Sequence, residues 1–85
     1  MIIGLGWDET YTLDPGFYDF IIDAAIVKGH EIVIVSERRP TVSNAEEVKH
    51  PKAKVYFTDS QPKKRYMSEQ GIKVDVWWES RPEVL

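Results

Sequence analysis

The stretch EIVIV at residues 31–35 decides the fold that we predict for this chain. Its run of β-branched side chains is typical of a strand in a parallel sheet, because such a strand is covered on both faces. A shorter apolar run, IIGL at residues 2–5, predicts a second buried strand. Both runs are far shorter than the roughly 18 apolar residues that a membrane span needs.

A helix is predicted between these two strands. Asp14 precedes Pro15, an arrangement typical of an N-cap residue followed by proline in the first helical turn. Gly29 is a suitable residue for the end of the helix, because it accepts a left-handed backbone. Between these ends, apolar residues recur at helical spacing. They are Phe17, Phe20, Ile21, Ala24, Ala25 and Val27.

The second half of the chain continues the alternation of strands and helices. Residues 54–58 and 74–78 predict a third and a fourth strand. Residues 45–49 predict a short helix, and a further helix is expected to be capped by Ser60 and to end at Gly71. Alternating strands and helices predict an α/β protein with a parallel sheet and right-handed crossovers, in a three-layer, Rossmann-like arrangement.

Length and composition limit the class of protein. The 85 residues make one domain, residues 1–85, with one modest core. The net charge of −3 argues against a general nucleic-acid binder, for which a basic excess is typical. The absence of cysteine excludes disulfides, thiolate metal sites and cysteine nucleophiles. No basic segment precedes the first apolar run, so we expect no signal peptide and a cytoplasmic location.

Ligands of such sheets bind beyond the carboxyl ends of the strands. Four segments of this chain follow predicted strands: residues 6–12, 36–39, 59–65 and 79–81. We therefore expect any binding or catalytic chemistry at the edge of the sheet where these segments meet.

Together these segments resemble the motifs of the haloacid dehalogenase (HAD) superfamily. GWDETYT at residues 6–12 resembles the first motif of that family, Asp-x-Asp-x-Thr. Ser36 stands where the family has a phosphate-binding Ser or Thr, and Lys63 where it has its phosphate-binding lysine. Glu79-Ser80 stands where it has an acidic pair. The resemblance covers nearly the whole chain. It implies a cap-less HAD-like domain with the strand order 3-2-1-4, similar to short proteins encoded by bacteriophages.

The sequence departs from the family at the positions that carry catalysis. The family's nucleophile is the first aspartate of motif one, and the residue here is Gly6, which has no side chain to attack phosphorus. Asp8 corresponds to the family's general acid/base and is vestigial without that nucleophile. Asp8 and Glu79 remain as weak candidate ligands for Mg²⁺. The resemblance therefore implies the fold and the pocket without the hydrolase activity. No cofactor is required, and Mg²⁺ would serve only a residual activity.

The remaining basic and polar residues predict a site for an anion. The run Lys63-Lys64-Arg65 lies at the expected start of a helix, where N–H groups and the helix dipole favour a bound anion. A solvated surface patch, or pairing with Asp59 and Glu69, is the alternative for this run. Ser36 would offer its hydroxyl, although a serine at this point also suits a simple turn. The residues that we expect to bind a phosphate-containing ligand are Gly6, Trp7, Asp8, Glu9, Thr10, Ser36, Arg38, Lys63 and Lys64.

Tryptophans flank the predicted site. Trp7 would offer a ring on which a nucleobase could stack, or it fills the core. Trp77 and Trp78 point to opposite faces of their strand, so at least one of them needs a cover from a helix or from another subunit. We therefore expect that the chain forms a homo-oligomer through its fourth strand.

Three functions follow from these residues. The first is a catalytically degenerate HAD-like protein that binds a nucleotide or a nucleotide-derived signal, such as a phage protein that sequesters a host immune signal in the host cytosol. The second is a weak Mg²⁺-dependent phosphatase that uses Asp8 or an activated water. The third is a protein–protein inhibitor of a host factor on the same scaffold. None of the three involves a membrane or general nucleic-acid binding.

Overall fold

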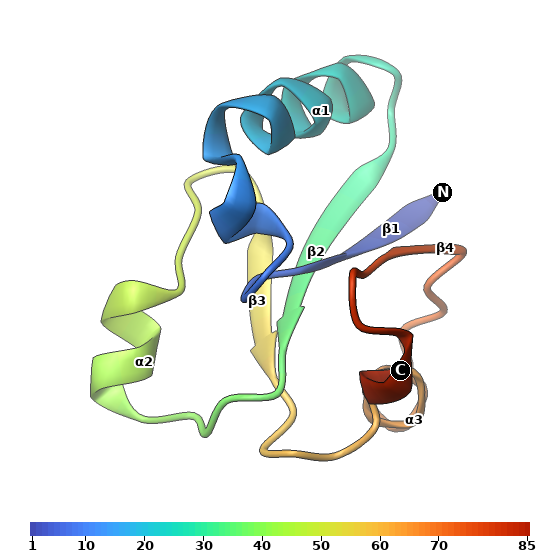
Figure 1. Cartoon of the computed structure of the whole chain (residues 1–85). Helices are drawn as coiled ribbons and strands as arrows, with labels where there is room; N and C mark the ends of the chain where they lie inside the picture. The colour runs from blue at the N-terminus through green and yellow to red at the C-terminus, as the bar shows by residue number, and fades with distance from the viewer.

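The computed structural model describes all residues, 1–85, and contains a single parallel sheet (Figure 1). Its strands are β1 (Ile2–Gly6), β2 (Glu31–Ser36), β3 (Lys54–Phe57) and β4 (Val76–Trp78). They lie in the order β3-β2-β1-β4, and every pair is parallel. The predicted α/β class and strand order are therefore confirmed, and the carboxyl ends of the strands meet at one edge.

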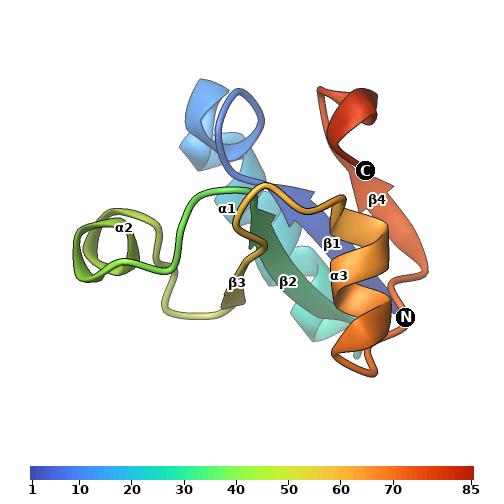
Figure 2. The same ribbon diagram turned by 90° about the horizontal axis from the view of Figure 1, so that it is seen from below.

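Helices cover the sheet on both faces and make the molecule three-layered. Figure 2 shows α1 (Pro15–Val27) and α3 (Lys63–Glu69) on opposite sides of the sheet, with α2 (Val42–Glu47) beyond the edge strand β3. The longest helix is α1, with 13 residues. None of the helices combines the length and the apolar character that crossing a bilayer requires.

The residues of β2 supply the centre of the core, as the stretch at residues 31–35 predicted. Ile32 and Ile34 pack in the cluster that includes Ile22 of α1, whereas Val33 and Val35 pack with Met67 of α3. Side chains alternate between the two faces of a strand, so each face of β2 contributes to a different layer. The strand needs apolar residues on both faces for this reason.

The ends of α1 follow the sequence prediction. The side chain of Asp14 accepts a hydrogen bond from the backbone N–H of Phe17 at 3.2 Å, and Pro15 opens the helix. After the helix, Gly29 has a φ of +83°, a conformation that suits glycine. The cap and the glycine turn together bring the chain back to β2.

The start of α3 differs from the prediction. Ser60 was expected to cap this helix, but α3 begins only at Lys63 and no side chain caps it. Ser60 instead has a φ of +69°, and its N–H donates to the carbonyl of Glu37 at 2.9 Å. The turn after β3 is therefore held by the loop after β2, a long-range contact that local propensity does not reveal.

Two further boundaries also differ. The short helix expected at residues 45–49 lies at Val42–Glu47, because the side chain of Thr41 accepts from the N–H of Asn44 at 3.1 Å and starts the helix earlier. The fourth strand, expected from residue 74, begins at Val76 and has only three residues. It forms one edge of the sheet, beside β1.

Candidate functional site

A small cavity lies at the carboxyl ends of the strands, where the sequence predicts the site. Its volume is about 10 Å³, room for about one water molecule. Ser36 and Lys63, the two residues expected to bind phosphate, both line it. The full lining consists of Asp8, Ser36, Glu37, Lys63, Glu79 and Arg81.

A buried ion pair forms one wall of the cavity. The ammonium of Lys63 lies 3.0 Å from Oε1 and 3.1 Å from Oε2 of Glu79, so it contacts both carboxylate oxygens. The two side chains are only 4% and 2% exposed. Removing one partner of such a pair leaves an uncompensated buried charge, which costs about 3–5 kcal/mol. The burial of each charged group is therefore stable only while the other group is present.

Glu79 occupies the space that a side chain at position 6 would need. A Cβ atom built on Gly6 would lie 2.0 Å from Oε2 of Glu79, far inside contact distance. In this chain a carboxylate is present at that place, but it belongs to the neighbouring strand end and is held by Lys63.

A second ion pair fixes the loop after β1. Nη2 of Arg38 lies 2.7 Å from Oδ1 of Asp8, and Nε lies 3.0 Å from Oδ2. Arg38 also contacts Oε2 of Glu47 at 3.0 Å. The hydrogen bonds and charge of Arg38, helped by Lys63 and Arg81 and opposed by burial, lower the pKa of Asp8. Both oxygens of Asp8 are therefore engaged, and the guanidinium of Arg38 is occupied by carboxylates of its own chain.

The loops after β1 and β4 are bound to each other. The N–H of Ser80 donates to Oγ1 of Thr10 at 3.1 Å, and the hydroxyl of Ser80 donates to the carbonyl of Glu9 at 2.7 Å. The hydroxyl of Thr10 then donates to Oγ of Ser80 at 2.9 Å. Thr10 is 2% exposed, and its hydrogen bonds with Ser80 hold the loop after β1 in place.

Arg81 joins a third loop to this assembly. Its Nη1 lies 3.3 Å from Oε1 of Glu37, in the loop after β2, and its Nε lies 3.8 Å from Oε2 of Glu9. Sequence reasoning missed Arg81 and Glu37 as site residues. The signal was their position, because each lies within the first few residues after a predicted strand.

Other residues predicted to bind ligand lie elsewhere. Trp7 is 8% exposed and its ring stacks on Tyr11, with centroids 4.5 Å apart, so it belongs to the core. Glu9 is exposed and Gly6 offers only its backbone. Lys64 lines a different hollow from Lys63. Of the nine expected residues, the structure brings Asp8, Ser36 and Lys63 to the cavity.

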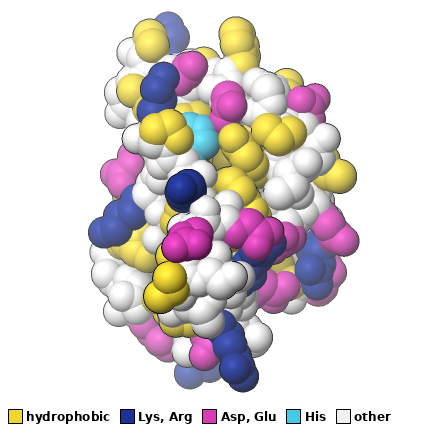
Figure 3. Space-filling view, turned by 90° about the vertical axis from the view of Figure 1, so that its left-hand side faces the viewer, with side chains coloured by type: hydrophobic (Ala, Val, Ile, Leu, Met, Phe, Trp, Pro, Cys, Tyr) yellow, Lys and Arg dark blue, Asp and Glu magenta, His cyan; other side chains and the backbone are white.

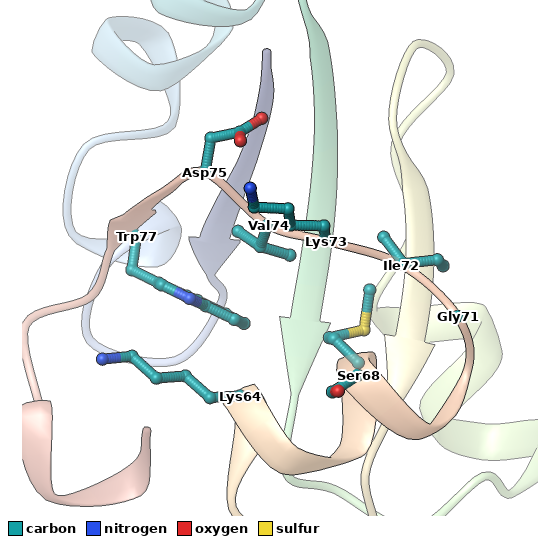
Figure 4. Close-up of a pocket in the computed structure, with 9 residues that line it drawn as sticks. Lys64, Ser68, Gly71, Ile72, Lys73, Val74, Asp75 and Trp77 are labelled. Carbon is teal, nitrogen blue, oxygen red and sulfur yellow. The ribbon is translucent and has the colours of Figure 1, made fainter.

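That second hollow is larger and lies between α3 and the segment leading into β4 (Figure 4). Its volume is about 520 Å³, and it is open to solvent. The ring of Trp77 points into it, with Lys64 and Ser68 of α3 on one side and Val74 on the other. The seven residues of α3 are too few to cover this face of the sheet completely.

The candidate metal ligands do not fit Mg²⁺. Asp8 and Glu79 each have a cation within 3.0 Å, and Gly6 supplies no carboxylate. No group of three or more His, Cys, Asp or Glu side chains is placed to hold a metal ion. Magnesium prefers an octahedron of oxygen ligands, which these paired carboxylates do not provide.

The charged groups that line the cavity all have partners of opposite sign. Asp8, Glu37 and Glu79 pair with Arg38, Arg81 and Lys63. Carboxylates outside the cavity also pair with the two arginines, Glu47 with Arg38, and Glu9 and Glu83 with Arg81. The whole network therefore has more carboxylates than cations.

Comparison with known proteins identifies no relative: no family model, no curated protein and no solved structure matches this chain.

Proposed function

We propose that this chain is a non-catalytic protein, built on a scaffold of the HAD type, that binds a phosphate-containing ligand at the ends of its strands. The observation that supports the proposal is the pair of hydrogen bonds that Lys63 donates to both oxygens of the buried Glu79 carboxylate, beside Gly6. In this interpretation Glu79 is an internal anion that occupies the phosphate position until a ligand replaces it.

The same residues argue for binding without cleavage. No side chain at position 6 is available to attack phosphorus, and both oxygens of Asp8 already accept hydrogen bonds from Arg38. A phosphate held by Lys63 and Ser36 would therefore meet no activated nucleophile. We propose a nucleotide or a nucleotide-derived signal as the ligand, which a phage protein would sequester from its host.

Binding requires an exchange of anions, because a cavity of about 10 Å³ has no room for phosphate beside Glu79. The Glu79 side chain would rotate towards solvent, and a phosphate oxygen would take its place on Lys63. The buried ammonium keeps a negative partner throughout, so the exchange avoids the cost of an unpaired buried charge. Ser36 and Arg81, which line the same cavity, would then contact the other phosphate oxygens.

The first prediction concerns the internal anion. In Glu79→Gln the side chain keeps its shape but loses its charge, so Lys63 lacks a counter-ion. We expect inorganic phosphate to raise the melting temperature of Glu79→Gln more than that of the wild type, in thermal unfolding at matched ionic strength. A ligand at 100 times its Kd adds about 2.7 kcal/mol.

The matched control is the double variant Lys63→Met with Glu79→Gln, in which the gain from phosphate should disappear. Circular dichroism shows whether both variants are folded. Equal phosphate effects in the wild type, the single variant and the double variant would remove Lys63 from the site and overturn the proposed function.

A further inference from the structure

Helix α1 presents a stripe of apolar residues to solvent. Leu13, just before the helix, is 74% exposed, and Phe17, Phe20 and Val27 are 49%, 71% and 84% exposed. Together with the exposed Ala24, they are spaced alternately four and three residues apart. This is the spacing with which one helix packs along another. We call these five residues the α1 stripe.

The opposite side of α1 already packs on the sheet. Ile22 and Ala25 are buried there, in the core cluster. The helix is therefore apolar on both sides, and a helix of that composition is normally covered all round. In Figure 3, several hydrophobic side chains are exposed over the upper part of the molecule, at the height of α1 in Figure 1, with charged side chains among them and below them.

We propose that the α1 stripe is the interface of a symmetric homodimer, in which the α1 helices of two copies pack antiparallel. A two-fold axis near the middle of the helix places Phe17 opposite Val27 of the second copy, and Phe20 opposite Ala24 of the second copy. Each layer then joins one phenyl ring to one smaller side chain. The stripe is thus complementary in volume to its own antiparallel image.

The charges at the ends of α1 favour the same orientation. Asp14 lies at the start of the helix, and Lys28, which has no ion-pair partner within the chain, lies at its end. An antiparallel pair brings Lys28 of one copy towards Asp14 of the other. A parallel pair would instead place like charges and like ends of the helix dipoles together.

A hollow beside the C-terminal half of α1 would receive part of the second copy. It is lined by Asp23, Ile26, Val27 and Lys52, and it is open on its outer side. In the antiparallel arrangement this hollow lies opposite Phe17 of the second copy. The phenyl ring would pack on Ile26 and Val27, beside the ion pair that joins Lys52 to Asp23 at 2.6 Å.

The size of the stripe predicts a weak dimer. A helix of 13 residues is about 20 Å long, and Trp78 extends the surface because its ring contacts Tyr18, which contacts Phe17. Such an interface is smaller than that of most stable complexes, so we expect a Kd in the micromolar range. The proposed dimer thus uses α1, whereas the sequence predicted association through the fourth strand, which has three residues and lies at an edge of the sheet.

The second prediction tests this interface by sedimentation equilibrium of the full chain, from about 10 µM to about 1 mM, a range that brackets micromolar affinity. The mass should rise from 9.9 kDa towards twice that value as concentration increases. In Phe20→Glu a carboxylate enters the centre of the interface, and the dimerisation constant should weaken by about tenfold or more. Phe20→Ser serves as a second variant of this exposed position.

The matched control is Val42→Glu, because Val42 is 78% exposed but belongs to α2, away from the stripe. This variant should associate like the wild type. A wild-type chain that stays monomeric at about 1 mM, or Phe20 variants that associate like the wild type, would overturn the proposal. An equal loss of association in Val42→Glu would do so too, because it would mark a non-specific hydrophobic contact.

Discussion

At the scale of single residues, Gly6 and Glu79 act as one unit. Gly6 ends β1 and Glu79 follows the neighbouring strand β4, and only one of the two positions has room for a carboxylate beside Lys63. The absent side chain at position 6 and the long side chain at position 79 are therefore complementary. With glycine at position 6, the carboxylate of Glu79 has room beside the buried Lys63 and pairs with it.

The third prediction follows from this complementarity. Gly6→Asp should be destabilising because the new side chain collides with Glu79, and Glu79→Ser should cost about 3–5 kcal/mol because Lys63 loses its partner. The double variant Gly6→Asp with Glu79→Ser supplies the carboxylate beside Lys63 from position 6 in place of position 79. Its free energy of unfolding in urea should lie closer to that of the wild type than either single variant does. Additive losses would contradict the coupling.

The fourth prediction concerns Asp19, which accepts hydrogen bonds from the hydroxyl of Tyr11 at 2.7 Å and from His50 at 2.8 Å. Tyr11 first, and then His50, lower the pKa of Asp19 in the folded chain. The unfolded value is about 3.9, so this stabilisation is present above about pH 4 and is lost as the pH falls through the lower folded value. In Asp19→Asn, urea unfolding at a series of acid pH values should show a smaller loss of stability.

The same contact acts in the opposite direction at high pH. Burial and the hydrogen bond to Asp19 raise the pKa of Tyr11 to about 12. Because the folded value lies above the ordinary value of about 10, the stabilisation is present below about pH 10 and is lost as the pH rises towards 12. Tyr11→Phe, which cannot ionise, is the matched control for this loss of stability at high pH.

At acid pH, the outcome that would contradict the prediction is a stability profile of Asp19→Asn equal to that of the wild type. Asp19 would then not be a source of the acid sensitivity.

At the scale of elements, the regular pieces of the chain could be predicted from local patterns. The β-branched run of β2, the Asp14 cap of α1 and the glycine after it each act within a few residues. Elements whose ends depend on distant contacts could not be placed in this way. Ser60, for example, is a good cap by residue type, but its N–H is bound by the loop after β2.

The same distinction holds for the candidate site. The order of strands predicted that Ser36 and Lys63 would meet, because the carboxyl ends of parallel strands share one edge. The sequence alone did not reveal how the charges pair. Arg38 was expected to bind a ligand and is instead held by Asp8 and Glu47. Which of several nearby opposite charges pair depends on side-chain geometry that spacing along the chain does not determine.

The fifth prediction belongs to α1. In Asp14→Ala the N–H of Phe17 loses its acceptor, so the free energy of unfolding should fall by about 0.5–2 kcal/mol in chemical denaturation. Thr41→Ala makes the matched change at the start of α2, which has six residues. It should cost less, because no residue of α2 is buried. If both variants lost the same free energy of unfolding, the Asp14 cap would contribute no more to stability than the Thr41 cap does.

At the scale of the whole molecule, the two faces of the sheet are covered unequally. The 13 residues of α1 cover one face and still expose an apolar stripe, whereas the seven residues of α3 leave an open hollow beside Trp77. A chain of this length has too few residues to cover both faces of the sheet completely with helices. A dimer through α1 would cover the exposed apolar stripe of the helix layer on one face.

The hydrogen bonds between Thr10 and Ser80 would affect the speed of the proposed exchange between Glu79 and a ligand. Glu79 lies between β4, which pairs with β1, and the anchored Ser80, so its backbone is fixed on both sides. In the proposed exchange only the Glu79 side chain would have to rotate, and no flap would have to open. Because this carboxylate is buried and paired with Lys63 through both oxygens, uptake would be governed by the breaking of that ion pair and by competition between two anions.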